Sequence, residues 1–148
     1  MTSDIMFYHA IETNMIAVLF ELLKKSFKDN KRCLVCIDTP ENATNISESL
    51  WAFQDNFILP HGLITEDMPD KQPILLTHNT DNINNADYIF FIGLIQITDT
   101  EHFKRCIVIF DDTSEDIKLH TREQFKLLKK NNVTLKYYQQ TNGKWHLR

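Results

Sequence analysis

The sequence predicts an α/β fold, a Rossmann-like three-layer sandwich in which a mostly parallel central sheet is flanked by helices. Strand-like and helix-like segments alternate along the chain, the order that builds parallel strand–helix–strand units. Several strand-like segments are apolar throughout, as expected for parallel strands covered on both faces. The chain has 148 residues, of which 43% are hydrophobic and 24% charged, so we expect a single domain over residues 1–148.

The first half of the chain provides two strand–helix pairs. A strand is expected over residues 5–11, and a helix over 14–27, where apolar residues recur at three- to four-residue spacing. An almost wholly apolar run at 33–38 predicts the second strand. Thr39 then offers an N-cap and Pro40 a first-turn residue to a second helix, which ends near residue 53.

The second half continues the alternation. Strands are expected at residues 74–77, 88–95, 106–110 and 133–140, with a short helix at 100–105 and a long one at 114–130. The last strand alternates between apolar and polar residues, as a strand with one wet face does. Whether this strand and the one at 74–77 run parallel or antiparallel to their neighbours is left open by the pattern.

Composition points to a soluble, cytoplasmic protein. The N-terminus lacks a basic region followed by an apolar run, and no segment reaches the ~20 apolar residues of a membrane-spanning helix. The three cysteines, Cys33, Cys36 and Cys106, lie in apolar runs, which favours buried thiols in a reducing compartment. Residues three apart on a strand face opposite sides. Cys33 and Cys36 are therefore expected in the core rather than at a metal or redox site.

The pattern offers little for catalysis, and we expect no catalytic residues, metal or cofactor. Nucleotide-binding turns of this fold use glycines to bring backbone N–H groups to phosphate. Here the turns after the first two strands lack glycine and carry Glu12 and Glu41. Asp111 and Asp112 end a strand, where they are either cation ligands or, more simply, part of a capped turn. A degenerate nucleotide-binding enzyme remains the alternative function.

Charge is segregated along the chain. Residues 1–117 carry eight basic and nineteen acidic residues, a net charge of −11. Residues 118–148 carry eight basic residues and a single acid, a net charge of +7, although the whole chain has a net charge of −4. Clustered cations repel one another unless an anionic partner meets them. This distribution predicts an anionic partner, the alternative being a solvated basic face.

The basic residues form a stripe on the last predicted helix. Lys118, Arg122 and Lys126 are spaced by four residues and spread over about 80° of the helix, with Lys129 inside that arc. Phe125 lies at the edge of the stripe. An arginine that takes a carboxylate through two hydrogen bonds, beside an apolar contact, is typical of acidic-peptide recognition.

Two further expectations concern this helix. Ile117, Leu127 and Leu128 lie opposite the stripe and are expected to face the sheet. A binder of single-stranded nucleic acid would interleave more aromatics with its cations than Phe125 and the following Tyr137 and Tyr138 provide. An acidic peptide is therefore the preferred ligand, and direct binding of single-stranded nucleic acid is the second alternative.

The stretch LWAFQDNFILPHGL, residues 50–63, crowds apolar residues into a loop. Phe57, Ile58 and Leu59 give more apolar surface than a loop facing water requires, which indicates an interface. His61 has no nucleophile or carboxylate beside it in the sequence. We interpret it as a loop residue that orients the turn together with Pro60.

Two motifs coincide with those of a known family. The sequence resembles the chi subunit of bacterial DNA polymerase III in Leu50-Trp51-Ala52 followed by Pro60-His61 and Leu63, and in Lys118, Arg122-Glu123, Phe125 and Lys126 of the basic helix. FYHAIETN near the N-terminus, KRCLVCID and Trp145 fit the same pattern. The resemblance follows the whole chain in order.

The resemblance implies a small α/β subunit without enzymatic activity, cofactor or membrane contact. Such a subunit forms a heterodimer with the psi subunit, joins the clamp-loader complex through it, and contacts DNA weakly or indirectly. It also binds the acidic C-terminal tail of single-stranded DNA-binding protein. By similarity the tail site comprises Lys118, Arg122, Phe125, Lys126 and Lys129, with Arg122 at the terminal carboxylate. The psi interface comprises Trp51, Phe57, Ile58, Leu59, Pro60 and His61, with either Phe57 or Ile58 as its anchor.

Overall fold

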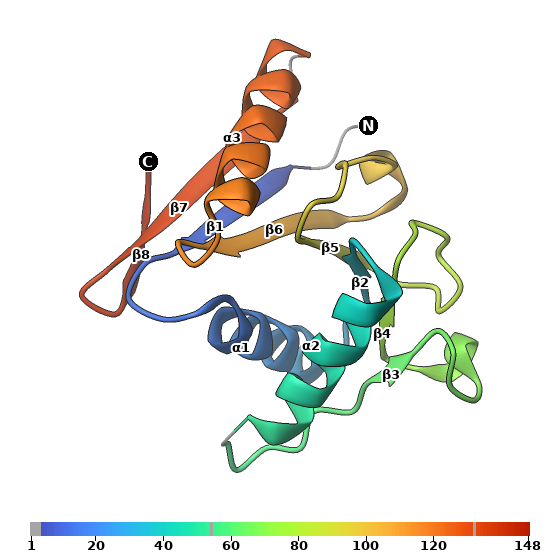
Figure 1. Ribbon diagram of the computed structural model, residues 1–148. Coiled ribbons are helices and arrows are strands. Elements are labelled where there is room, and N and C mark those ends of the chain that lie inside the picture. The colour runs from blue at the N-terminus through green and yellow to red at the C-terminus, as the bar shows by residue number, and fades with distance from the viewer. Residues whose placement is uncertain (1–3, 54, 132) are drawn as a thin grey trace.

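An eight-stranded sheet forms the centre of the molecule (Figure 1). The computed structural model describes residues 4–53, 55–131 and 133–148. The strand order is β3-β4-β2-β5-β6-β1-β7-β8, and every pairing is parallel except the antiparallel β7–β8 hairpin. The strands are β1 (Ile5–Ala10), β2 (Cys33–Ile37), β3 (Gly62–Leu63), β4 (Ile74–Thr77), β5 (Tyr88–Ile92), β6 (Arg105–Asp111), β7 (Leu135–Thr141) and β8 (Lys144–Leu147).

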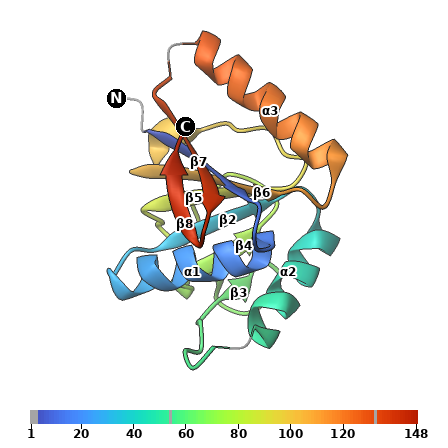
Figure 2. The ribbon, with the colours of Figure 1, turned by 90° about the vertical axis from the view of Figure 1, so that its left-hand side faces the viewer.

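Helices cover both faces of the sheet, which confirms the predicted Rossmann-like sandwich. Helices α1 (Met15–Lys28) and α2 (Pro40–Ala52) pack on one face, and α3 (Glu115–Lys130) packs on the other (Figures 1 and 2). Two short 3₁₀ turns, η1 (Pro69–Lys71) and η2 (Thr100–His102), lie in the connections. No helix in the described part of the chain is long and apolar enough to cross a membrane.

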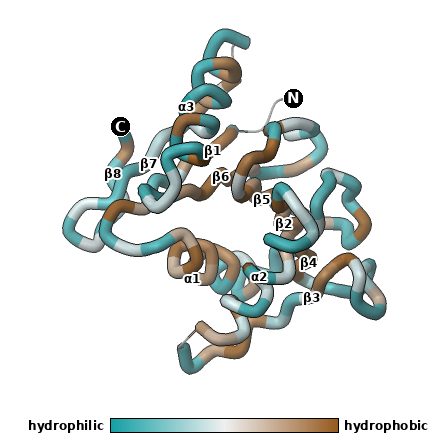
Figure 3. Tube along the Cα trace, in the orientation of Figure 1, coloured by the Kyte–Doolittle hydropathy of each residue, from teal (hydrophilic) through white to brown (hydrophobic). Residues whose placement is uncertain are grey.

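The core is divided by the sheet into two apolar layers, and the inner strands are hydrophobic along their length (Figure 3). Cys33 belongs to the layer under α1 and α2, and Cys36 to the layer under α3. The two thiols therefore point to opposite faces, as their spacing predicts. Burial raises the pKa of both, and of Cys106, to about 12.

Side-chain caps set the starts of the helices. The Asn14 side chain accepts the Ala17 N–H at 2.9 Å, and Thr39 accepts the Asn42 N–H at 3.1 Å. Ser114 accepts the Ile117 N–H at 3.3 Å. Each cap satisfies an N–H that the first helical turn leaves free, so the helices begin within a residue of the predicted positions.

Two expectations about strands and turns are revised, one open question is answered, and two strands are added. The fifth strand ends at Ile92 instead of residue 95, because Gly93 turns the chain with φ +91° against the Asp38 carboxylate. The short helix expected at 100–105 is a single 3₁₀ turn. Strands β4 and β7, whose direction was open, are parallel to their neighbours. Strands β3 and β8 were not predicted.

Candidate functional site

A groove lies between α3 and the end of the sheet formed by β7 and β8. It has a volume of ≈390 Å³, and its lining side chains come from α3, β7 and the residue after β8. They are Arg122, Phe125, Lys126, Lys129, Tyr137 and Arg148. Four of the five residues predicted for peptide binding are therefore brought together. Arg148 was not singled out in the sequence, where a lone arginine after an unrecognised strand gave no signal.

Aromatic rings form one wall of the groove. Phe125 meets Phe7 edge to face at 5.1 Å between ring centroids, and Tyr137 in the same way at 5.7 Å. Such edge-to-face pairs favour a fixed ring arrangement. Phe125 is thus half-buried and held in place, so that a ligand side chain would meet a preformed apolar surface.

The cations around this wall form no ion pair with the described acidic side chains. Arg122, Lys126 and Lys129 are exposed, and no ion pair joins them to an acidic side chain within the described residues. Burial raises the pKa of the Tyr137 hydroxyl, while the nearby Arg122 charge opposes that rise. The groove therefore combines a positive potential with an apolar wall.

Lys118 lies apart from the groove. Its ammonium is 3.5 Å from an Asp112 carboxylate oxygen and 3.8 Å from one of Glu115, so acids of the protein itself balance its charge.

The apolar face of α3 that was expected to pack on the sheet is only partly buried. Leu128 packs against the core as expected, but Leu127 is 49% exposed. Leu127 lies about 100° around the helix from Leu128, which turns it to solvent.

A chain of polar side chains centred on the buried His9 lies next to the groove. The Tyr137 hydroxyl lies 2.8 Å from Nδ1 of His9, and Nε2 of His9 lies 2.6 Å from Asp112. His9 is 3% exposed. The hydrogen bond with His9 is the main reason that the pKa of Asp112 is lowered, and nearby Lys118 adds to it. This network, which joins residues far apart in sequence, was not predicted.

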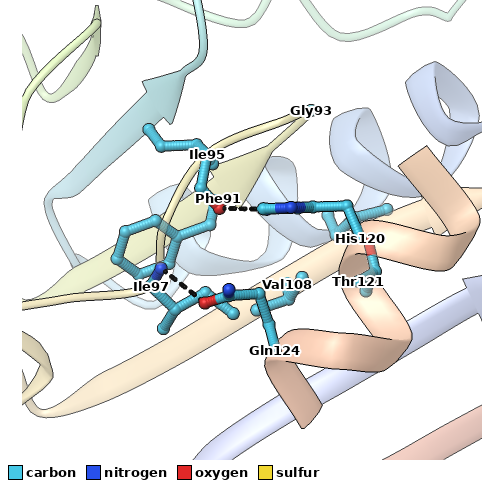
Figure 4. A pocket seen from close by; sticks show the side chains of 9 residues that line it. Phe91, Gly93, Ile95, Ile97, Val108, His120, Thr121 and Gln124 are labelled. Atoms are coloured by element: carbon cyan, nitrogen blue, oxygen red, sulfur yellow. Dashed lines mark hydrogen bonds between the residues drawn. The ribbon is translucent and has the colours of Figure 1, made fainter. Parts of the chain in front are cut away.

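Two contacts fix α3 relative to the β5–β6 connection. Nε2 of His120 lies 2.8 Å from the Ile95 carbonyl oxygen, and Oε1 of Gln124 accepts the Ile97 N–H at 3.2 Å (Figure 4). The space beside them is only ≈10 Å³, about the volume of one water-sized sphere. These side chains therefore close the layer under α3 and hold the groove wall in position.

The carboxyl ends of the central strands are where this fold binds phosphates in nucleotide enzymes. There Asp111 accepts the Met15 N–H at the start of α1, at 2.7 Å. Asp38 accepts the Leu94 N–H at 2.9 Å and the Asn42 side-chain amide at 2.8 Å. Carboxylates thus occupy the donors that a phosphate would need, which weighs against the nucleotide-binding alternative and supports the capping interpretation of Asp111.

The loop after α2 presents a second candidate surface. Ile58 is 80% exposed and Trp51 is 54% exposed, whereas Leu59 is 2% exposed and belongs to the core. Phe57 is half-buried, with the ammonium groups of two α1 lysines 5.6 and 5.3 Å from its ring centre. Of the two anchor candidates, Ile58 is therefore the one that faces solvent.

His61 fixes this loop from within. It is 6% exposed, with Nδ1 2.9 Å from the Leu59 carbonyl oxygen and Nε2 3.2 Å from that of Ser47. The Trp51 ring stacks on His61 at 4.0 Å. Trp51 and Ile58, with the partly exposed Pro60, thus form the surface, and Leu59 and His61 support it from below.

Comparisons with known proteins agree with the resemblance seen in the sequence. The family model described as DNA polymerase III chi subunit, HolC, matches residues 1–136. The protein named "Probable DNA polymerase III subunit chi" from Rickettsia prowazekii (strain Madrid E) is 25% identical to this chain over 111 residues. That alignment covers 70% of this chain and 67% of the Rickettsia protein.

Proposed function

Because the chain belongs to the DNA polymerase III chi subunit family, we propose that it is a non-catalytic accessory subunit of the holoenzyme in DNA replication. In this role it links the clamp loader, through the psi subunit, to single-stranded DNA-binding protein. The link to the latter is its acidic C-terminal tail, which binds in the groove beside α3. The observation that carries this proposal is the set of uncompensated cations around a preformed aromatic wall.

The groove suits the end of an acidic peptide. Arg122 offers a planar guanidinium that takes a terminal carboxylate through two hydrogen bonds. Phe125 and Tyr137 offer an apolar wall for an aromatic or aliphatic last residue. Lys126 and Lys129 also line the groove and offer ammonium groups to further carboxylates. Lys118 lies on the same face of α3, but Asp112 and Glu115 balance its charge, so its contribution to peptide binding is expected to be the smallest of the five.

The second surface suits an apolar partner. Ile58 and Trp51 are both exposed, and exposed apolar side chains, tryptophan among them, are typical of an interface centre. In the proposed heterodimer Ile58 is the anchor that enters the psi subunit, and Trp51, Phe57 and Pro60 surround it. Leu59 and His61 act indirectly, by holding the loop in the shape that presents Ile58.

The test of the groove is a calorimetric titration with an acidic peptide ending in Asp-Phe. Arg122→Ala is expected to weaken binding by ~1.5–3 kcal/mol, the scale of a lost charge-assisted hydrogen bond. Arg105→Ala is the matched control, because it removes one exposed arginine from β6 and leaves the same net charge. Equal affinities of Arg122→Ala and the control would rule out the assignment.

A capture experiment tests the partner itself. The immobilised protein should retain full-length single-stranded DNA-binding protein from a lysate and fail to retain the same protein lacking its C-terminal tail. Retention of both forms would show that the contact lies elsewhere on the partner.

A further inference from the structure

Strand β8 and the residue after it carry basic side chains at alternate positions. Lys144, His146 and Arg148 are all exposed, and their two-residue spacing places them on one face of the strand. Trp145 points to the other face, where its ring meets Tyr8 edge to face at 5.1 Å in the layer under α1 and α2. The basic residues therefore point to the α3 side of the sheet.

A backbone hydrogen bond places the end of this row at the groove. The Arg148 N–H donates to the Tyr137 carbonyl oxygen at 2.7 Å, and both side chains line the groove. Toward the hairpin turn, His146 pairs with Gln139 and Lys144 pairs with Thr141. The four residue steps from Lys144 to Arg148 span about 13 Å, so the row extends the cationic surface by that length beyond the groove.

The row is accessible, and its lysine and arginine form no ion pair with the residues that the structure describes. β8 is the last strand of the sheet (Figure 2). No ion pair joins Lys144 or Arg148 to an acid in the described part of the chain. The Glu12 carboxylate accepts the N–H groups of Asn142 and Gly143 at 3.0 and 2.7 Å, and so serves the hairpin turn.

We propose that Lys144, His146 and Arg148 form an extension of the peptide site that takes the acidic residues preceding the terminal ones. The inference rests on the proposed function and deepens it. An extended peptide places alternate side chains on one side with the same two-residue period as the row. Its carboxylates then face Lys144 and Arg148, in the way that opposite charges pair across strands. The family model matches residues 1–136, so the row at 144–148 lies outside the matched part of the chain.

Two peptides of equal length test the extension. Both end in Asp-Phe, and the upstream positions carry aspartates in one peptide and serines in the other. We expect the aspartate peptide to bind the wild-type protein more tightly. Lys144→Ala should weaken the aspartate peptide about two- to five-fold, the range of an exposed ion pair, and leave the serine peptide unchanged. Lys144→Glu should weaken the aspartate peptide further.

Lys71→Ala is the matched control, since it removes one exposed lysine from η1. It should leave both affinities unchanged. Equal binding of the two peptides to the wild type, or equal effects of Lys144→Ala on both, would overturn the extension and leave the groove assignment intact. Failure of both peptides to bind would overturn the proposed function and the extension together. A single-stranded oligonucleotide that binds through Lys144, with no difference between the peptides, would also overturn the extension.

Discussion

The groove beside α3 and the loop after α2 offer opposite chemistries at opposite edges of one sheet. In the groove, cations stand exposed on a helix above aromatic rings that the core holds in place. In the loop, a single isoleucine is exposed while the residues on either side are wholly or partly buried. Cationic side chains are well solvated when exposed, so a regular helix is enough to display them. An exposed apolar side chain on a loop needs buried neighbours that fix its direction.

The largest expected effect on stability distinguishes the buried Leu59 from its exposed neighbour Ile58. Leu59→Ala should lower the free energy of unfolding by about 2–5 kcal/mol, because it empties a fully buried site. Ile58→Ala should change it by less than about 0.5 kcal/mol, since Ile58 is exposed. Urea denaturation of both variants measures the difference. Similar losses would place Ile58 in the core and remove the contrast between the neighbours.

The second prediction concerns partner binding at the loop. Ile58→Asp should weaken the complex with the psi subunit by about 2–4 kcal/mol, the cost of removing a central apolar anchor. The melting temperature should change little. Met68→Asp, which adds the same charge at another exposed apolar residue, serves as the control. Co-purification and gel filtration with psi report the complex, and an intact complex with Ile58→Asp would move the interface elsewhere.

Salt should distinguish the two surfaces. Interactions of exposed charges are screened over ~8–10 Å at physiological ionic strength, so raising the salt concentration should weaken acidic-peptide binding several-fold. Binding of psi at Ile58 should depend on salt much less, because it buries apolar surface. Isothermal titrations of both ligands over a salt series measure this difference. A salt-independent peptide affinity would point to an apolar site rather than the groove.

The smallest expected effect is a shift in acid stability. The His9 hydrogen bond lowers the pKa of Asp112, and the Phe57 N–H lowers that of Asp55 in the loop. A lowered carboxyl pKa adds stability that is present above the ordinary aspartate value of about 3.9 and is lost as the pH falls through the lower, folded-state value. Asp112→Asn and Asp55→Asn should each flatten the acid side of a stability–pH curve. An unchanged curve would mean that these bonds do not favour the ionised side chains.

Elements built on local patterns were predictable from the sequence. Apolar spacing located the three α-helices, with the Thr39 cap marking the start of the second, and apolar or alternating runs located six strands. Strand β3 is only two residues long, too short for any periodicity to register. Strand β8 was missed because it has no run of apolar residues: Trp145 is partly buried, and the other residues of the strand are exposed. β5 ends where Gly93 turns the chain with φ +91° and the Leu94 N–H donates to Asp38, a tertiary contact that no local pattern contains.

The groove was partly predictable for the same reason. Helical spacing gathered Arg122, Phe125, Lys126 and Lys129, because a helix turns sequence distance directly into position. The balance of charge on Lys118 and the buried His9 network depend on which strands lie side by side. In the loop, the alternation between exposed Ile58 and buried Leu59 depends on His61 reaching back to α2. Such contacts follow from the fold and not from spacing.

The order of the sheet has a consequence for assembly. The loop lies next to β3 at one edge, and the groove lies next to β7 and β8 at the other. With strands about 4.8 Å apart, eight of them hold these edges roughly 34 Å from each other. A ligand at one surface therefore does not exclude a ligand at the other. The rigid sheet acts as a spacer of fixed length, so that whatever binds the loop gains a high effective concentration toward whatever binds the groove.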